Sequence, residues 1–239
     1  MKLEKSVTPG NSSQIFFISP SVFGGLFYLT LNKNFKSDLK YMTRKLKIAI
    51  TGSIGSGKST FSEMLEEKGF TVLKADDISK KILSTDPEVR KIVIEEFGTG
   101  SYLDGEVNKK YLAEKVFSNP ENVLIINSIL HPPVIKKIDE MMIEELKKND
   151  KVFVEAALIY EAYMEGMFDY VVLITAGREL RSDRKSQDLS SQDFEKRDAN
   201  QIPDEEKKKR ADFIFENNGS IEELKSKAGL LLSLLPASN

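Results

Sequence analysis

Cysteine is absent from this 239-residue chain, and histidine occurs once, as His131. The missing thiols exclude disulfides, zinc–thiolate sites, iron–sulfur clusters and cysteine nucleophiles, and they are compatible with a reducing cytoplasm, where we expect the protein to act. A single imidazole also excludes a histidine metal cluster.

A strong excess of either charge is lacking too, because 35 Lys and Arg residues balance 37 Asp and Glu residues, for a net charge of -2. Without a bulk positive field, we expect no nucleic-acid partner, and any anionic ligand must be held by a local site. With 40% apolar and 30% charged residues, the composition is that of a globular protein with one generous domain or a core with an appendage.

The first 41 residues differ from the rest of the chain. Residues 15–31 are strongly apolar but are interrupted by Pro20 and by a Gly-Gly pair. Three interpretations remain open for residues 1–41: a membrane anchor, a cleaved secretory signal, and a disordered extension upstream of a mis-assigned start. We expect residues 42–239 to form a self-sufficient domain that needs no membrane.

Short apolar runs alternate with longer helical patterns in this domain. The runs begin at Leu46, Thr71, Lys151, Tyr170 and Ala211. Runs of this length and apolar content are typical of strands buried on both faces of a parallel sheet. Their alternation with helices predicts an α/β fold with five parallel strands and right-handed crossovers.

One motif decides the class of protein. Residues 52–59 match the phosphate-binding loop pattern G-x-x-x-x-G-K-[ST], between a predicted strand and a predicted helix. Glycines allow backbone N–H groups to approach phosphate oxygens, and the helix N-terminus points at the same oxygens. Lys58 can bridge the β- and γ-phosphates, and the Ser59 hydroxyl can ligate Mg²⁺. The expected ATP-binding residues are Gly52, Ser53, Ile54, Gly55, Ser56, Gly57, Lys58, Ser59 and Thr60.

The loop alone does not say what happens to the phosphate. A regulatory GTPase would show D-x-x-G and N-K-x-D after the loop, and neither is present. A motor or transporter ATPase would show an apolar strand ending in Asp-Glu, whereas the candidate strand ends Val154-Glu155-Ala156. The sequence therefore favours a small kinase that moves a γ-phosphoryl group to a bound acceptor.

Such a kinase needs a carboxylate beside the acceptor hydroxyl. Asp76 and Asp77 close the predicted strand that begins at Thr71, at the edge of the sheet where ligands gather. We expect Asp76 to be the catalytic base and Asp77 to cap a helix that begins at Ile78.

Six segments share order and spacing with a known family. They are GSIGSGKST (52–60), KADDISKKIL (74–83), FGTGSYLDGEVNKKYLAEKVFSNPE (97–121), ILHPPV (129–134), EAALIYEA (155–162) and RADFIFENNGS (210–220). Together they resemble dephospho-coenzyme A kinase. The resemblance implies transfer of the ATP γ-phosphoryl group to the ribose 3′-hydroxyl of dephospho-CoA, the last step of coenzyme A synthesis, with Mg²⁺. It also implies acceptor-binding helices near 77–150 and a lid near 178–210.

The resemblance assigns roles to further residues. Asp76 matches the family's proposed base, Ser59 and Glu155 would hold Mg²⁺, and Asn218 lies where the family binds adenine. In the lid, we expect Arg184 or Arg197 to close onto the phosphates. Lys58, Asp76, Arg184 and Arg197 are thus the expected catalytic residues. The expected acceptor-binding residues are Asp76, Lys109, His131, Leu158, Tyr160 and Glu161.

The chain departs from the family pattern at several of these positions. Lys74, Glu155 and Lys109 stand where the family usually has Asp, Asp and Arg, and residues 178–187 do not follow the usual lid pattern. Two alternatives therefore stay open: a kinase for another acceptor, such as a nucleoside, a nucleotide or a small sugar acid, and a nucleotide-binding module without catalysis. We expect a monomer or a small homo-oligomer.

Overall fold

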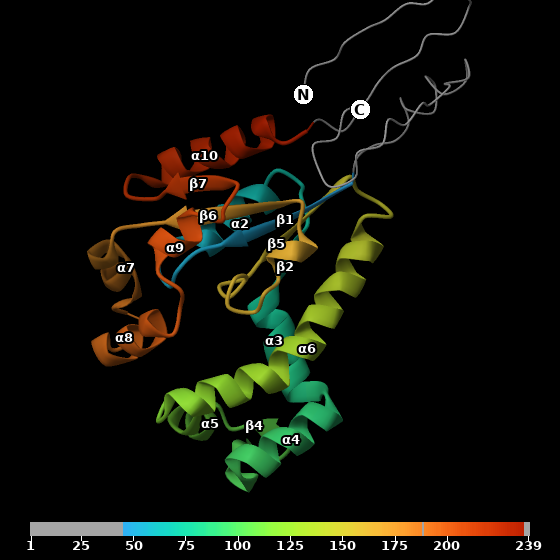
Figure 1. Ribbon diagram of the computed structural model, residues 1–239, viewed down its shortest axis with the longest axis vertical. Coiled ribbons are helices and arrows are strands. Elements are labelled where there is room, and N and C mark those ends of the chain that lie inside the picture. The colour runs from blue at the N-terminus through green and yellow to red at the C-terminus, as the bar shows by residue number, and fades with distance from the viewer. Residues whose placement is uncertain (1–44, 188, 237–239) are drawn as a thin grey trace, which may run out of the picture. The chain divides into compact units, whose positions relative to one another are not determined.

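A computed structural model describes residues 45–187 and 189–236, so the apolar extension and the start at Met42 lie outside the described residues. Its centre is a parallel sheet with the strand order β2-β5-β1-β6-β7 (Figure 1). The strands are β1 (Leu46–Thr51), β2 (Val72–Lys74), β5 (Lys151–Glu155), β6 (Tyr170–Thr175) and β7 (Phe213–Glu216). The five-stranded parallel sheet expected from the sequence is thereby confirmed.

The register of the central strands brings their carboxyl ends to one edge of the sheet. β1 lies between β5 and β6, with Ile50 level with Glu155 on one side and with Val172 on the other. Ile50 and Val172 are fully buried, as expected for strands covered on both faces. The turn after β1 therefore emerges beside the last residue of β5.

Helices cover both faces of the sheet. On one face, α2 (Lys58–Glu66) and α10 (Ile221–Leu234) pack apolar side chains against the strands, with Phe61 and Leu65 fully buried. On the other face lie α3 (Ala75–Thr85) and the carboxyl-terminal half of α6 (Pro120–Glu145).

A second apolar core lies beyond the sheet. It is formed by α4 (Pro87–Phe97), α5 (Lys109–Val116), a hairpin of two-residue strands and the first half of α6. The hairpin strands are β3 (Tyr102–Leu103) and β4 (Glu106–Val107). Short 3₁₀ turns in the described residues include η1 (Thr99–Ser101) and η2 (Glu165–Met167). The hairpin was not expected, because strands this short carry no readable periodicity. α6 connects the two cores, since it buries Ile126 in one and Ile138 in the other.

His131 is followed by two prolines, which are most common at the first position of a helix, yet all three residues lie within a helix. His131, Pro132 and Pro133 lie inside α6, and Figure 1 shows this helix changing direction along its length. A proline removes a backbone hydrogen bond and its ring clashes with the preceding turn, so a proline pair bends a helix. Packing at both ends keeps the helix continuous across the bend.

The prediction that the second strand reaches Asp76 and that a helix begins at Ile78 is wrong. β2 ends at Lys74 and α3 begins at Ala75, so both aspartates lie in the first helical turn. Negative charge is favoured there by the helix dipole. Asp77 does not cap the helix, since its carboxylate lies 3.0 Å from Lys80 Nζ on the surface.

The region expected to form a lid contains three helices, α7 (Arg178–Lys185), α8 (Ser191–Ala199) and α9 (Asp204–Lys208). They stand between β6 and β7 in the chain, at the same edge of the sheet as the turn after β1 (Figure 1). Among residues 45–187 and 189–236, no helix has the length and apolar content to cross a bilayer.

Candidate functional site

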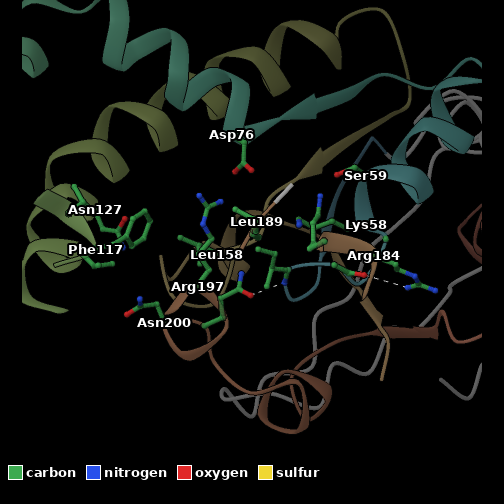
Figure 2. Close-up of a pocket in the computed structure, with 18 of the residues that line it drawn as sticks. Lys58, Ser59, Asp76, Phe117, Asn127, Leu158, Arg184, Leu189, Arg197 and Asn200 are labelled. Atoms are coloured by element: carbon green, nitrogen blue, oxygen red, sulfur yellow. Dashed lines mark hydrogen bonds between the residues drawn. The ribbon is translucent and has the colours of Figure 1, made fainter. Parts of the chain in front are cut away.

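A cavity of about 750 Å³ opens at the carboxyl edge of the sheet (Figure 2). Its wall combines residues from the phosphate-binding loop, α3, α6, the loop after β5 and the lid helices. The predicted site residues that it brings together are Ile54, Gly55, Gly57, Lys58, Ser59, Thr60, Asp76, Leu158, Arg184 and Arg197. The phosphate-binding loop, the expected base and both lid arginines thus border one space.

The phosphate-binding loop needs its glycines for two reasons. Gly55 and Gly57 have φ values of +78° and +94°, a region that L side chains rarely adopt. A Cβ at Gly57 would also lie 2.2 Å from Asn217 Nδ2, which donates a 2.8 Å hydrogen bond to the Ser56 carbonyl. Asn217 was not among the expected site residues. Its position directly after a strand of the sheet was the signal that could have identified it as a support of the loop.

Lys58 opens α2 and is partly buried beside two carboxylates. Burial lowers the pKa of Lys58 from its ordinary value of 10.5, and the negative charges of Asp76 and Glu155 act in the opposite direction. Both carboxylates are therefore close enough to interact with the ammonium group. A polyphosphate bound at this helix N-terminus would meet both the lysine charge and the helix dipole.

The two residues expected to hold Mg²⁺ contact each other. Ser59 Oγ donates a 2.6 Å hydrogen bond to Glu155 Oε1, and Glu155 is buried at the end of β5. A hydroxyl and a carboxylate are hard oxygen ligands, which suit Mg²⁺ together with phosphate oxygens. Within residues 45–187 and 189–236, no group of three or more acidic or histidine side chains could hold a metal by itself. The residues present therefore fit an ion that arrives with a nucleotide.

Asp76 faces the cavity from the first turn of α3. In Figure 2 its carboxylate points toward the guanidinium group of Arg197, which comes from α8. Arg197 in turn lies over the ring of Phe117, 5.5 Å from its centroid. Arg197 therefore links a lid helix to the helical region that carries the second core.

Arg184 occupies a different position, although it also borders the cavity. Its Nη2 donates a 2.8 Å hydrogen bond to the Asn217 carbonyl, and its Nη1 lies 3.4 Å from the Gly55 carbonyl. In Figure 2 its guanidinium group points away from Asp76. In this conformation Arg184 contacts the back of the phosphate-binding loop, whereas Arg197 faces the expected base.

Several predicted acceptor-binding residues lie elsewhere. In the described part of the chain, the cavity wall does not include Lys109, His131, Tyr160 or Glu161. Lys109 is exposed at the start of α5, and His131 is half-buried within α6. Tyr160 is buried, which raises the pKa of its hydroxyl to about 12. Their roles in binding the acceptor stay predictions.

Asn218, expected near adenine, also lies outside the cavity wall as the structure describes it. Its Oδ1 accepts a 2.9 Å hydrogen bond from Gly177 N, which joins the turns after β6 and β7. Phe117 and Asn127, which were not among the expected site residues, border the cavity from the end of α5 and from α6. Neither residue belongs to a motif with a chemical signature, so no local signal pointed to them.

Comparisons with known proteins bear on the whole domain. A family model described as Dephospho-CoA kinase matches residues 46–223. The curated dephospho-CoA kinase of Chlamydia caviae is 36% identical over 190 residues, which cover 78% of this chain and 94% of that protein. The one from Carboxydothermus hydrogenoformans is 37% identical over 180 residues, covering 73% and 87%.

Two solved structures agree with these matches. Dephospho-CoA kinase from Campylobacter jejuni superposes with a TM-score of 0.60 and 33% identity, covering 78% of this chain and 95% of that one. The protein TT1252 from Thermus thermophilus gives a TM-score of 0.66 and 32% identity, covering 81% and 100%. Since the matched residues include the phosphate-binding loop, Asp76 and the lid helices, the chain belongs to the dephospho-CoA kinase family.

Proposed function

We propose that this protein transfers the γ-phosphoryl group of ATP to the ribose 3′-hydroxyl of dephospho-CoA, giving coenzyme A and ADP. The observation that carries the proposal is that Asp76 and Lys58 border the same cavity and interact electrostatically. A hydroxyl bound beside Asp76 would therefore stand next to a phosphate held by Lys58. This is the juxtaposition that phosphoryl transfer requires.

The residues have distinct tasks in this reaction. Asp76 accepts the proton of the 3′-hydroxyl while the bond from that oxygen to the γ-phosphorus forms and the bond from the γ-phosphorus to the β-phosphate oxygen breaks. Lys58 and the amides of the phosphate-binding loop stabilise negative charge on the phosphates. Arg197, which faces Asp76 in Figure 2, is placed to add positive charge from the lid.

Mg²⁺ would be held by Ser59 and Glu155 together with phosphate oxygens. When bound, it supplies neutralisation of phosphate charge. Glu155 replaces the aspartate usual in the family, but its carboxylate still reaches Ser59.

The acceptor side of the cavity is suited to a nucleotide with an apolar extension. Its wall is largely apolar and includes Val116, Phe117, Val123, Ile126 and Leu158, with the amide of Asn127 among them. An aromatic ring and aliphatic side chains can pack against a base or an alkyl chain, while a few polar groups fix its orientation. This wall supports dephospho-CoA over a small sugar acid.

The decisive experiment measures ADP release by the full chain with ATP and Mg²⁺ in the presence of different acceptors. We expect turnover with dephospho-CoA to exceed turnover with nucleosides, nucleotides and sugar acids by at least about 100-fold, because those acceptors lose either the polar contacts or the apolar ones. A higher rate with another acceptor would replace the proposed substrate. Tight ATP binding without ADP release would instead indicate a nucleotide-binding module.

We further expect the enzyme to act in the cytoplasm as a monomer or a small homo-oligomer.

A further inference from the structure

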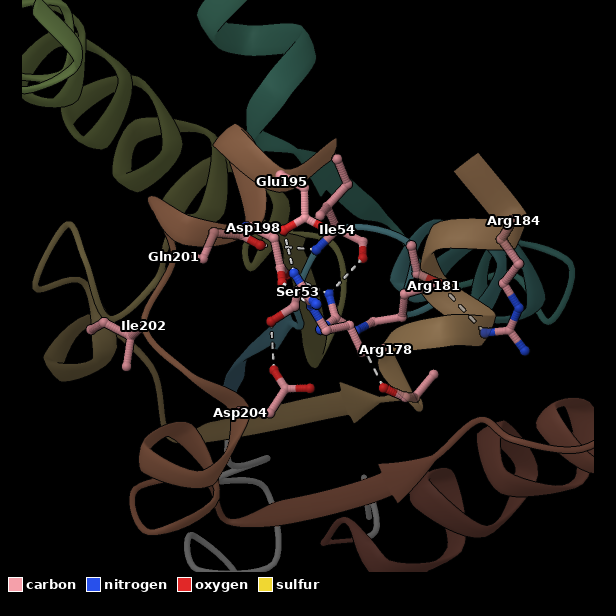
Figure 3. A network of polar contacts seen from close by, with 12 residues as sticks. Ser53, Ile54, Arg178, Arg181, Arg184, Glu195, Asp198, Gln201, Ile202 and Asp204 are labelled. Atoms are coloured by element: carbon pink, nitrogen blue, oxygen red, sulfur yellow. Dashed lines mark hydrogen bonds and ion pairs between the residues drawn. The ribbon is translucent and has the colours of Figure 1, made fainter. Parts of the chain in front are cut away.

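Residues 201–207 contact the phosphate-binding loop through two side chains. Ile54 N donates a 2.9 Å hydrogen bond to Gln201 Oε1, and Ser53 Oγ donates a 2.5 Å hydrogen bond to Asp204 Oδ1. Figure 3 shows both side chains directed at the loop. This segment, which runs from the end of α8 into α9, is therefore attached to the nucleotide side of the site.

The same segment is attached to the loop after β5. Lys207 Nζ lies 3.1 Å from Glu161 Oε1, and Ile202 N donates a 2.8 Å hydrogen bond to the same oxygen. The Lys207 side chain is 0% exposed and that of Glu161 is 13% exposed. Lys207 Nζ has no partner with hydrogen-bond geometry in the described chain, so the contact between the two side chains is an ion pair.

This ion pair is connected to the acceptor side of the cavity through the loop after β5. Glu161 closely follows Ala157 and Leu158, which border the cavity, but neither Glu161 nor Lys207 is part of the wall as described. A second contact strengthens the attachment, since the Arg210 guanidinium lies over the ring of Tyr160, 4.5 Å from its centroid, and also contacts Glu165. The chain around α9 is thus fixed to the loop after β5 at neighbouring points.

We propose that Lys207 and Glu161 are positioning residues, and that residues 201–207 form a bracket. The bracket sets the distance between the phosphate-binding loop and the acceptor wall, which is the acceptor side of the cavity described above, by holding the loop that carries Leu158. The proposal rests on the function proposed above. In phosphoryl transfer the acceptor oxygen must be aligned with the γ-phosphorus, and a misplacement of about 1 Å can lower the rate about 100-fold. The bracket joins the phosphate-binding loop, which would hold the ATP phosphates, to the loop after β5, which carries Leu158 on the acceptor side.

A stabilising role alone is a poor explanation for this pair. Removing two charges from water is costly, so a buried ion pair often adds little stability over apolar residues of similar size. An ion pair between these two side chains does, however, hold α9 at a fixed distance from the loop after β5.

The test compares two variants of the full chain, Lys207→Met and the double variant Glu161→Gln with Lys207→Met. The double variant removes both charges, so no buried charge is left unpaired, and the glutamine can still accept the hydrogen bond from Ile202 N. Lys208→Met is the matched control, because Lys208 lies on the same helix and pairs with Glu205 at 2.8 Å on the surface. The measurements are kcat, KM for ATP and for dephospho-CoA, affinity for a non-hydrolysable ATP analogue, and thermal unfolding.

We expect both variants to lose at least about tenfold in kcat, while affinity for the ATP analogue and both KM values change less than about threefold, because each surface stays intact and only their separation changes. Lys208→Met should match the parent. The positioning role would be overturned by a double variant whose unfolding temperature and kcat both equal those of the parent chain. It would also be overturned if both variants were unfolded at the assay temperature, because the pair would then serve stability. A parent chain without turnover of dephospho-CoA would contradict the proposed function instead.

Discussion

The phosphate-binding loop and the acceptor wall border one cavity but are built differently. The loop occupies consecutive residues 52–59, and its shape follows from glycines with positive φ and from the helix that begins at Lys58. The acceptor wall collects Val116, Ile126 and Leu158 from α5, α6 and the loop after β5. A contiguous loop is specified by local backbone requirements, whereas such a wall depends on the packing of several elements.

This difference predicts how each side responds to substitution. On the nucleotide side, a small change of backbone geometry alters several amide donors together, because consecutive residues provide them. On the acceptor side, each side chain comes from another element and contributes more independently. Asp76 and Arg197 stand where the two sides meet, so the largest effects are expected there.

Asp76→Asn should have the largest effect, a loss of about 10²- to 10⁴-fold in kcat with ATP affinity retained, because the amide cannot accept the proton of the acceptor hydroxyl. Steady-state ADP release and binding of an ATP analogue measure the two quantities. Asp77→Asn is the matched control, since Asp77 is the next residue and its side chain is 65% exposed beside Lys80. Equal losses in the two variants would remove Asp76 from the role of base.

Substitutions of the two lid arginines should have the next largest effects, and the two variants should differ in the kinetic constant that changes. Arg197→Ala should lower kcat about 100-fold, because a positive group that faces the base and the transferring phosphoryl group is lost. Arg184→Ala should act mainly on KM for ATP, since Arg184 contacts the carbonyls of Gly55 and Asn217 behind the loop. Equal kcat losses would show that both arginines reach the phosphates during turnover.

Gly57→Ala should weaken ATP binding by about tenfold or more, because the new Cβ would displace Asn217 from the Ser56 carbonyl and distort the amides of the loop. Gly69→Ala isolates the backbone contribution. Gly69 has a φ of +86° but nothing within 4 Å of an added Cβ, so this variant should cost about 1 kcal/mol of stability and leave ATP binding unchanged. Calorimetric titration and thermal unfolding check the pair, and comparable ATP affinities would contradict a steric requirement at Gly57.

The smallest effect concerns acid stability. Burial lowers the pKa of His131 in the folded chain below its ordinary value of 6.5, and Glu161 opposes only part of this shift. Between the lowered pKa and 6.5, the unfolded chain binds more protons than the folded chain, so stability falls as the pH is lowered through this window. His131→Gln should flatten this part of the curve of unfolding free energy against pH.

His131 is the only histidine, so its NMR titration is free of overlap from other imidazoles. A folded-state pKa at or above 6.5 would contradict the prediction. An unchanged pH profile in His131→Gln would show that other groups govern acid stability in this range.

Much of the architecture could be predicted because it depends on local signals. All five predicted strands are present, and α2 begins at Lys58, within the expected loop-to-helix motif. The boundary at Asp76 was placed incorrectly, because an apolar run does not show where a buried strand gives way to a helix that starts at once. The continuity of α6 across its proline pair could not be predicted for a related reason, since packing at both ends of the helix outweighs the local cost of proline.

By itself, the sequence determined the parallel sheet, the phosphate-binding loop and the family, because periodicity, glycine spacing and motif order are properties of neighbouring residues. Only the tertiary structure decided that Arg197 faces Asp76 while Arg184 lies behind the loop, and that Lys207 pairs with Glu161. These choices follow from how the lid helices pack on the edge of the sheet. Residue type and spacing do not predict that packing. The sequence pattern of a charged helix is the same whether a given side chain points into a cavity, into another loop or into solvent.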